Sequence, residues 1–114
     1  MNTNPKECKT FIRPVRDVID LIGGKWKLPI IIALSFKNHR FNELEKQIDG
    51  ITPRMLSKEL KNLEINGLVT RQVYHTTPVT VEYGLTDYGK SLDDVIATMR
   101  DWGLKHRKKI MEEG

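Results

Sequence analysis

The segment "ITPRMLSKELKNLEINGLV", residues 51–69, carries the side chains with the clearest chemistry. Its polar set begins with one arginine and continues three, four and seven residues later: Arg54, Ser57, Lys58 and Lys61. An arginine can donate two hydrogen bonds to a guanine edge, a serine can serve any base edge, and lysines neutralise phosphates. This set therefore has the chemistry to bind a nucleic acid.

A helix is needed to bring these side chains to one side. On a helical wheel, at about 100° per residue, the polar set centres about 140° from a cluster of leucines. These leucines are Leu56, Leu60 and Leu63. Thr52 can cap the helix and Pro53 suits its first position. We expect a helix over about 53–66, anchored by leucines, with its cationic side outward. The alternative is that its lysines are merely solvated, as on most exposed helices.

The preceding segments predict three more helices. Pro14 suits the first turn of a helix that stops at Gly23-Gly24. Residues 25–35 are apolar nearly all round, which is typical of a buried helix. In "FNELEKQI", Asn42 can be the N-cap of the next helix, with Glu45 completing a capping box. The "DGI" that follows predicts a tight turn before the cationic helix.

After residue 67 the pattern changes to strands. "LVTRQVY" and "VTVEYGL" are rich in β-branched and aromatic residues, and "HTTP" is expected to join them as a hairpin loop. Arg71 is expected to oppose Glu82 as a cross-strand pair of this hairpin. Thr86 can cap a last helix over about 87–110. The predicted fold is mainly α with a small β-hairpin, a winged helix-turn-helix.

The bulk properties fit one small domain. The chain has 114 residues and a net charge of +4, with no apolar run long enough for a membrane helix and no signal-peptide pattern. We expect a mobile N-terminal arm over residues 1–12 and one domain over 13–114. A single cysteine excludes an internal disulfide framework and fits the reducing cytoplasm.

The order and spacing of five segments are specific: "DLIGGKW" (20–26), "RFNELEKQI" (40–48), "ITPRMLSKELKNLEINGLVTR" (51–71), "VEYGLTDYGKSL" (81–92) and "DWG" (101–103). Through them the chain resembles the HxlR-type family of bacterial winged-helix transcriptional regulators. The resemblance implies a dimeric, operator-binding protein of the bacterial cytoplasm, associated with the nucleoid. Many members carry a cysteine just before the first helix, where this chain has Arg13.

The DNA contacts that we expect fall into two groups. The recognition helix contributes the polar set above together with Thr52 at its start. Further contacts to the DNA backbone are expected from the hairpin loop, or wing, through His75, Thr76 and Thr77. Two cations outside the recognition helix, Lys25 and Arg40, are also expected to contact the backbone. For His75 the alternative is an ordinary solvated loop histidine.

The last helix overreaches a three-helix core, so its far end is expected to pair with a second copy, with Phe11 and Ile12 adding to the contact. The residues expected at this dimer contact on the last helix are Val95, Met99 and Trp102. The alternative is that this stripe belongs to the core of a single chain. A small-molecule effector, if one exists, would have to use the dimer crevice.

Other chemistry finds little support. Cys8 could sense oxidants, but nothing nearby in the sequence would clearly activate its thiol, and an inert exposed thiol is the stronger interpretation. "GLTDYGKS" matches the phosphate-binding loop pattern, but it follows a hairpin strand and contains Asp87. No metal or other cofactor is expected, since the three histidines lack partners at ligand spacing.

Two other functions remain possible from the sequence alone. The main rival to a DNA-binding regulator is a winged helix used only for protein–protein binding, in which the cationic face would tolerate charge reversal. An enzyme is the third possibility, but the chain shows no nucleophile–base pair and no paired carboxylates.

Overall fold

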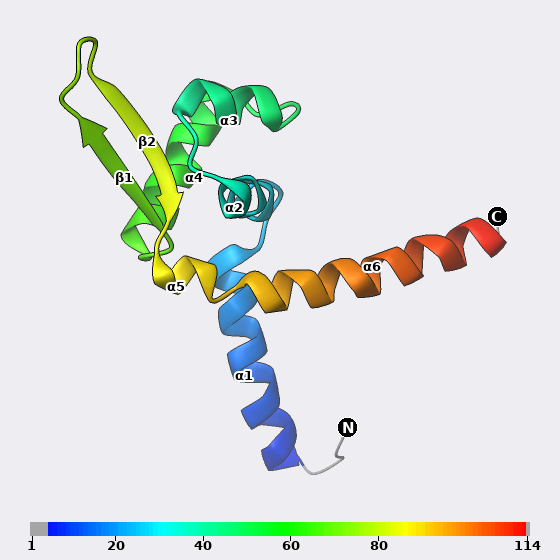
Figure 1. Ribbon diagram of the computed structural model, residues 1–114. Helices are drawn as coiled ribbons and strands as arrows, with labels where there is room; N and C mark the ends of the chain where they lie inside the picture. Colours follow the sequence, from blue (N-terminus) through cyan, green and yellow to red (C-terminus); the bar gives the residue numbers. More distant parts are fainter. Residues whose placement is uncertain (1–4, 114) are drawn as a thin grey trace.

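The computed structural model describes residues 5–113, which form a mostly helical domain with one antiparallel hairpin, as predicted (Figure 1). The elements, in chain order, are α1 (Pro5–Ile22), α2 (Lys27–Phe36), α3 (Phe41–Gln47), α4 (Pro53–Ile65), β1 (Val69–Tyr74), β2 (Thr80–Leu85), α5 (Asp87–Lys90) and α6 (Asp93–Glu113). None of these helices is long and apolar enough to cross a bilayer.

The core lies between α2, α3, α4 and the base of the hairpin. Its buried apolar residues come from each of these elements and include Ile30, Ile31, Leu44, Leu68 and Val69. The three leucines of α4 are all buried against them. Burial of one leucine side chain contributes about 1.5–3 kcal/mol. This leucine anchor therefore holds α4 on the core with a fixed rotation about its axis.

The hairpin is extended by a third short strand segment. His39 donates its N–H to the carbonyl oxygen of Tyr83 at 3.0 Å, and Tyr83 donates back to His39 at 2.8 Å. The His39 side chain is buried, with Nδ1 2.7 Å from the Lys37 carbonyl oxygen. The segment before α3 is thus tied to the wing, and His39 belongs to the core rather than to a metal site.

The register of the hairpin differs from our prediction by one residue. Arg71 lies opposite Tyr83, and Gln72 lies opposite Glu82. The loop runs from His75 to Val79, because Tyr74 pairs with Thr80. Since Val79 belongs to the loop and not to the strand, the expected pair between Arg71 and Glu82 is wrong.

The first helix begins earlier than predicted. Helix α1 begins at Pro5, so residues 5–12, predicted as a mobile arm, are helical; residues 1–4 lie outside the described part. Pro14 is inside the helix instead of in its first turn. The physical reason is that the apolar stripe of α1 continues through Phe11, and one proline removes only one backbone hydrogen bond.

Two helix boundaries differ from the prediction because of contacts between residues distant in the sequence. The N-cap of α3 is Arg40 and not Asn42: the strand segment at His39 leaves Arg40 extended, and its N–H donates to Glu43 Oε1 at 2.8 Å. The predicted single helix over 87–110 is two helices. Gly89 packs so closely on the Leu68 carbonyl that a Cβ would collide with it, which holds α5 against the hairpin and lets α6 leave in another direction.

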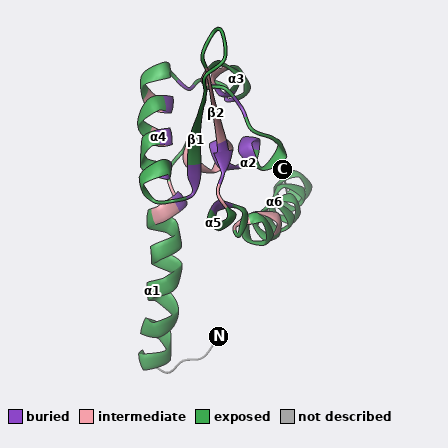
Figure 2. Cartoon of the chain, turned by 60° about the vertical axis from the view of Figure 1, so that its left-hand side comes forward, coloured by how far each residue is buried: buried purple, intermediate pink, exposed green. Residues whose placement is uncertain are grey.

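Helices α1 and α6 project from this core in different directions (Figure 1). Figure 2 shows both as almost entirely exposed, while the buried residues gather in α2, α4 and the base of the hairpin. In the same view α1 lies below α4 along one side of the protein.

Candidate nucleic-acid interface

Helix α4 presents the predicted polar set to solvent. Thr52 caps the helix, because its Oγ1 accepts a hydrogen bond from the Met55 N–H at 3.2 Å, and Pro53 occupies the first position as predicted. With the leucines buried, all members of the polar set are exposed: Arg54, Ser57, Lys58 and Lys61. The structure therefore brings together on one helix face the four residues that the sequence predicted.

The start of α4 is fixed by a tight turn. Gly50 has φ of 85°, a left-handed conformation that residues with a Cβ rarely adopt. On either side of it, Ile48 and Ile51 are buried, and the Ile51 N–H donates to the Ile48 carbonyl oxygen at 3.3 Å. Two apolar anchors thus hold the turn between α3 and α4, as in a helix-turn-helix unit.

An ion pair that sequence reasoning missed also positions α4. Lys27 Nζ lies 2.9 Å from Glu59 Oε2, and both side chains are largely buried. Glu59 lies on the flank of α4, between the leucines and the cations, and it pairs with a cation at the start of α2. In the sequence, the one signal for this ion pair is the presence of the acidic Glu59 in a helix rich in cations. The sequence does not indicate that its partner is Lys27.

The wing residues are at the tip of the hairpin, away from the helices (Figure 1). His75, Thr76 and Thr77 are all exposed. The Thr76 hydroxyl donates to the Pro78 carbonyl oxygen at 2.7 Å, which orders the loop. The three predicted wing residues thus share one exposed loop, but this loop is a separate surface from the face of α4.

The two predicted cations outside these elements have different surroundings. Lys25 is exposed, and its Nζ lies 4.8 Å from the centre of the Trp26 ring, a cation–π geometry. Arg40 is exposed at the start of α3. Its backbone N–H, bonded to the Glu43 carboxylate, lowers the pKa of Glu43, and the charges of Lys37, His39 and Arg40 lower it further.

This arrangement can be compared with known proteins. A family model described as HxlR-like helix-turn-helix matches residues 21–111, most of the chain. The chain belongs to the HxlR-like helix-turn-helix family.

Relatives and structural neighbours of this HxlR-like protein share one functional class. YdeP of Bacillus subtilis, an uncharacterised HTH-type transcriptional regulator, is 44% identical over 97 residues, which cover 85% of this chain and 76% of YdeP. The redox regulator HypR in its reduced form is 39% identical, with a TM-score of 0.81 over 87% of this chain and 98% of HypR. Reduced YodB, a transcriptional regulator of B. subtilis, is 38% identical, with a TM-score of 0.74 over 79% of this chain and 88% of YodB. The family consists of transcriptional regulators and not of enzymes, which supports a DNA-binding regulator.

The HxlR-like chain also carries exposed apolar side chains on its two projecting helices. On α1 they include Phe11, 59% exposed, and Ile12, 46% exposed. On α6 they include Val95, Met99 and Trp102, of which Trp102 is 68% exposed. Leu92, just before α6, and Ile96, in its first turns, pack against the core. The α6 stripe beyond them is therefore not part of the core of one chain.

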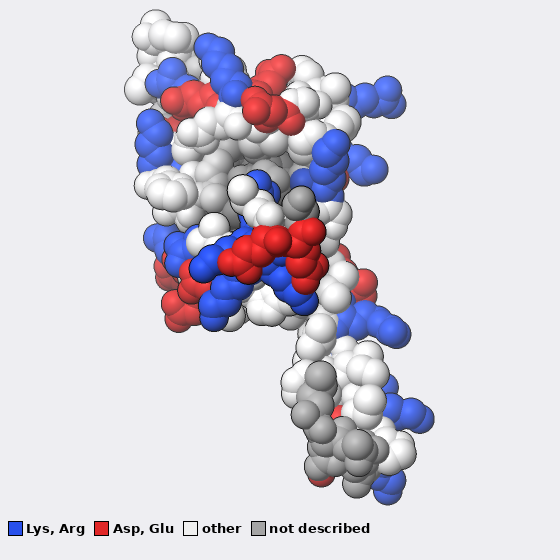
Figure 3. Space-filling model, turned by 90° about the vertical axis from the view of Figure 1, so that its right-hand side faces the viewer, with Lys and Arg blue, Asp and Glu red and all other residues white. Residues whose placement is uncertain are grey.

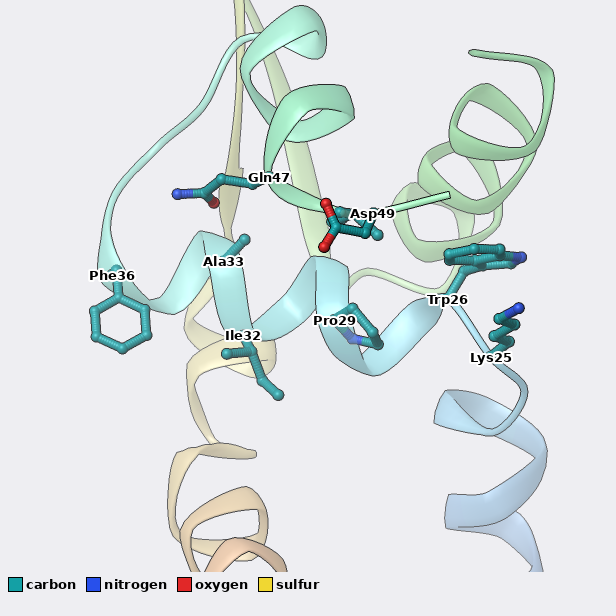
Figure 4. Close-up of a pocket in the computed structure, with 9 residues that line it drawn as sticks. Lys25, Trp26, Pro29, Ile32, Ala33, Phe36, Gln47 and Asp49 are labelled. Carbon is teal, nitrogen blue, oxygen red and sulfur yellow. The ribbon is translucent and has the colours of Figure 1, made fainter. Parts of the chain in front are cut away.

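A hollow of about 590 Å³ lies between α2 and the end of α3 (Figure 4). Pro29, Ile32 and Ala33 of α2 form its apolar side, and Gln47 and Asp49 border it from the α3 end. A second hollow of about 390 Å³ lies between α2 and α6 and shares Ile32 with the first. The outer face of α2 is thus an apolar surface that the single chain leaves uncovered.

Cys8 lies on α1, where it is exposed. Within residues 5–113, no group of three or more His, Cys, Asp or Glu side chains is arranged to hold a metal ion. The phosphate-loop pattern "GLTDYGKS" spans the end of β2 and the short helix α5, where the Thr86 hydroxyl accepts the Gly89 N–H at 3.0 Å. That segment is a helix cap following a hairpin strand.

Proposed function

We propose that this protein binds operator DNA as a homodimer and thereby regulates transcription. The observation that carries the proposal is the two-sided character of α4. Its leucines are buried on one side, and Arg54, Lys58 and Lys61 are exposed on the other. A helix held in this way can enter the major groove, which is about 12 Å wide, without being pulled from the core.

In this proposal the residues of α4 have different tasks. Arg54, in the first turn, reaches base edges, where arginine bonds guanine O6 and N7 in a bidentate way. Ser57 adds a contact to a base edge. Lys58 and Lys61 neutralise phosphates and supply affinity that depends on salt. The Thr52 hydroxyl already accepts the Met55 N–H, so its own proton is free to be donated to a phosphate oxygen.

The wing and two further cations contact the DNA backbone. The exposed loop with His75, Thr76 and Thr77 is proposed to lie over the sugar-phosphate backbone or a minor groove beside the site. Lys25 and Arg40 add phosphate contacts. These residues contribute affinity and orientation but little sequence information.

We propose that a second copy of the chain covers the exposed stripes of α1 and α6. Large apolar side chains such as Phe11, Met99 and Trp102 on projecting helices are typical of an interaction surface. A two-fold dimer uses the same surface from both copies. It would present its two α4 helices about 34 Å apart, one turn of duplex, so the operator should be a near-palindrome.

Control by other signals is proposed as follows. A small-molecule effector would occupy the crevice between protomers, next to the apolar outer face of α2. Cys8 is proposed to be an inert thiol, although HypR is a redox regulator. The test is oxidation: a reversible loss of DNA binding that disappears in Cys8→Ser would overturn this assignment.

The function is tested by selecting bound fragments from genomic DNA and titrating the best fragment with salt. We expect one near-palindromic sequence to be enriched and its affinity to fall steeply with salt. Charge reversal at Lys58 and Lys61 separates this function from a protein-only module. Full retention of fragment binding by Lys58→Glu/Lys61→Glu, or no enriched sequence at all, would refute DNA recognition by α4.

A further inference from the structure

Helix α1 carries several cations on a face that the DNA and dimer contacts proposed above do not use. Lys9, Arg13 and Arg16 are separated by four and three residues, so they lie on one side of the helix. All three are exposed, and together they border one surface hollow of about 400 Å³. Ile12 and Asp17 complete its rim. The hollow thus carries three cations and one carboxylate, and this excess of positive charge suits an anion.

This basic stripe, defined as Lys9, Arg13 and Arg16, is separate from the apolar side of α1. At about 100° per residue, its centre lies roughly 130° from the centre of the stripe that contains Phe11, Val15 and Val18. The two faces meet at Ile12, which borders the hollow, so a second copy that covers Phe11, Val15 and Val18 would reach the edge of the basic stripe without covering its three cations. The charge is also concentrated, since residues 5–16 contain four cations and one acid, Glu7.

The position of α1 brings this helix into line with α4. Figure 2 shows α1 and α4 following one another along the same side of the protein. In Figure 3 Lys and Arg side chains lie on the right-hand side of the view over the main body and over the projecting helix α1, with some Asp and Glu between them, and further Lys and Arg lie on the left side of the main body. A duplex held against α4 would thus continue toward α1.

We propose that the basic stripe of α1 binds the phosphate backbone of the DNA duplex next to the segment read by α4. This inference rests on the proposed function and extends it. These three positive charges are complementary to phosphates and lie on a helix that follows α4 along the protein. They would lengthen the contact with DNA by several phosphates. They would add affinity for any sequence but no discrimination between bases.

A lipid surface is the other polyanion that a basic, amphipathic helix can bind. The position of α1 favours DNA, because the helix follows α4 along the same side of the protein (Figure 2). On a bilayer the apolar stripe of α1 would be buried in the lipid and would no longer be available to a second copy of the chain. Binding to DNA instead leaves the apolar stripe free for a second copy of the chain.

The test is the triple variant Lys9→Gln/Arg13→Gln/Arg16→Gln of the full chain. Its affinity is measured against salt on a duplex of about 40 base pairs that carries the fragment selected by the wild type, which is long enough for two half-sites and their flanks. Each lost phosphate contact should make the negative slope of log Kobs against log salt less steep by about 0.9. Affinity at 0.15 M salt should fall about tenfold or more. The hydroxyl-radical footprint should shorten beside the half-sites.

A matched control removes the same charge elsewhere. The variant Lys105→Gln/Lys108→Gln/Lys109→Gln on α6 should keep the wild-type slope and footprint. Circular dichroism and sedimentation must show that both triple variants keep the helix content and oligomeric state of the wild type. If the α1 triple variant does not fold, Arg13→Gln alone is compared, with an expected slope change of about 0.9 for each contact that it removes.

The outcomes separate this inference from the proposed function. An α1 variant with the slope and footprint of the wild type overturns the basic stripe as a DNA contact and leaves recognition by α4 intact. Loss of binding to anionic phosphatidylserine vesicles, with unchanged DNA binding, also overturns it in favour of a membrane contact. If the wild type itself selects no fragment, the proposed function fails, and this inference fails with it.

Discussion

Lys27 Nζ lies 2.9 Å from Glu59 Oε2, and this ion pair joins the start of α2 to α4, the helix that we propose to read the DNA. Their side chains are 18% and 17% exposed, so the pair is neither a surface bridge nor fully buried. Because Glu59 shares α4 with the cations that we propose to contact DNA, the bond limits how far the helix can rotate or shift on its leucine anchor.

Removal of one partner should destabilise the fold. We expect Glu59→Gln to lower the free energy of unfolding by about 1–3 kcal/mol, between the values for exposed and for buried pairs, because Lys27 then keeps a partly buried charge without its partner. Urea denaturation measures the change. A double-mutant cycle with Lys27→Met isolates the coupling, and a coupling near zero would contradict a positioning role.

Substitutions of Arg54 and Lys61 should have different effects on DNA binding. Arg54→Ala should cost about 1–3 kcal/mol of binding to the selected fragment and should blur specificity at one base pair. Lys61→Ala should weaken all sequences about equally and reduce the salt slope by about 1. Competition assays on a set of single-base operator variants measure both effects. Equal loss of specificity in the two variants would show that the roles assigned to them are wrong.

The cap of α4 should contribute to stability. Thr52→Ala removes the acceptor for the Met55 N–H and should cost about 0.5–2 kcal/mol of unfolding free energy. Thr52→Ser keeps the hydroxyl and serves as the control. Thermal or urea unfolding distinguishes the two variants. An alanine variant as stable as the serine variant would mean that the cap contributes nothing to the free energy of unfolding.

The dimer contact is tested on its exposed apolar residues. Met99→Glu and Phe11→Glu place charges on side chains that are 48% and 59% exposed in the single chain, so the fold should tolerate them. In a dimer they would bury unpaired charges, which is strongly unfavourable. Sedimentation should show monomers, and operator affinity should fall more than tenfold because one half-site is lost. Dimers in both variants would locate the contact elsewhere.

Stability against acid should depend on Glu43. The hydrogen bond from the Arg40 backbone N–H, helped by nearby positive charge, lowers the pKa of Glu43 below its ordinary value of 4.5. A lowered folded-state pKa means that the stabilisation is complete above the unfolded-state pKa and is lost as pH falls through the folded-state pKa. The stability advantage of the wild type over Glu43→Gln should therefore shrink below about pH 4.5. Urea midpoints measured at several pH values test this, and a constant difference would contradict it.

The sequence alone determined the features that depend on near neighbours. The period of the leucines and cations in residues 53–66 decides which side of α4 faces outward, whatever that helix packs against. Thr52 and Thr86 cap their helices as predicted, because a cap is a contact over three residues. The hairpin and its order after α4 follow from the change in residue period for the same reason.

The tertiary structure decided whatever depends on residues distant along the chain. The start of α3 at Phe41 follows from the pairing of His39 with Tyr83, 44 residues later in the chain. The partner of Glu59 is likewise far away in sequence, at Lys27. Such contacts leave no period in the sequence, since they arise only when elements pack on a common core. For that reason the sequence could name the cationic face of α4, but only the packed structure shows what holds that face in position.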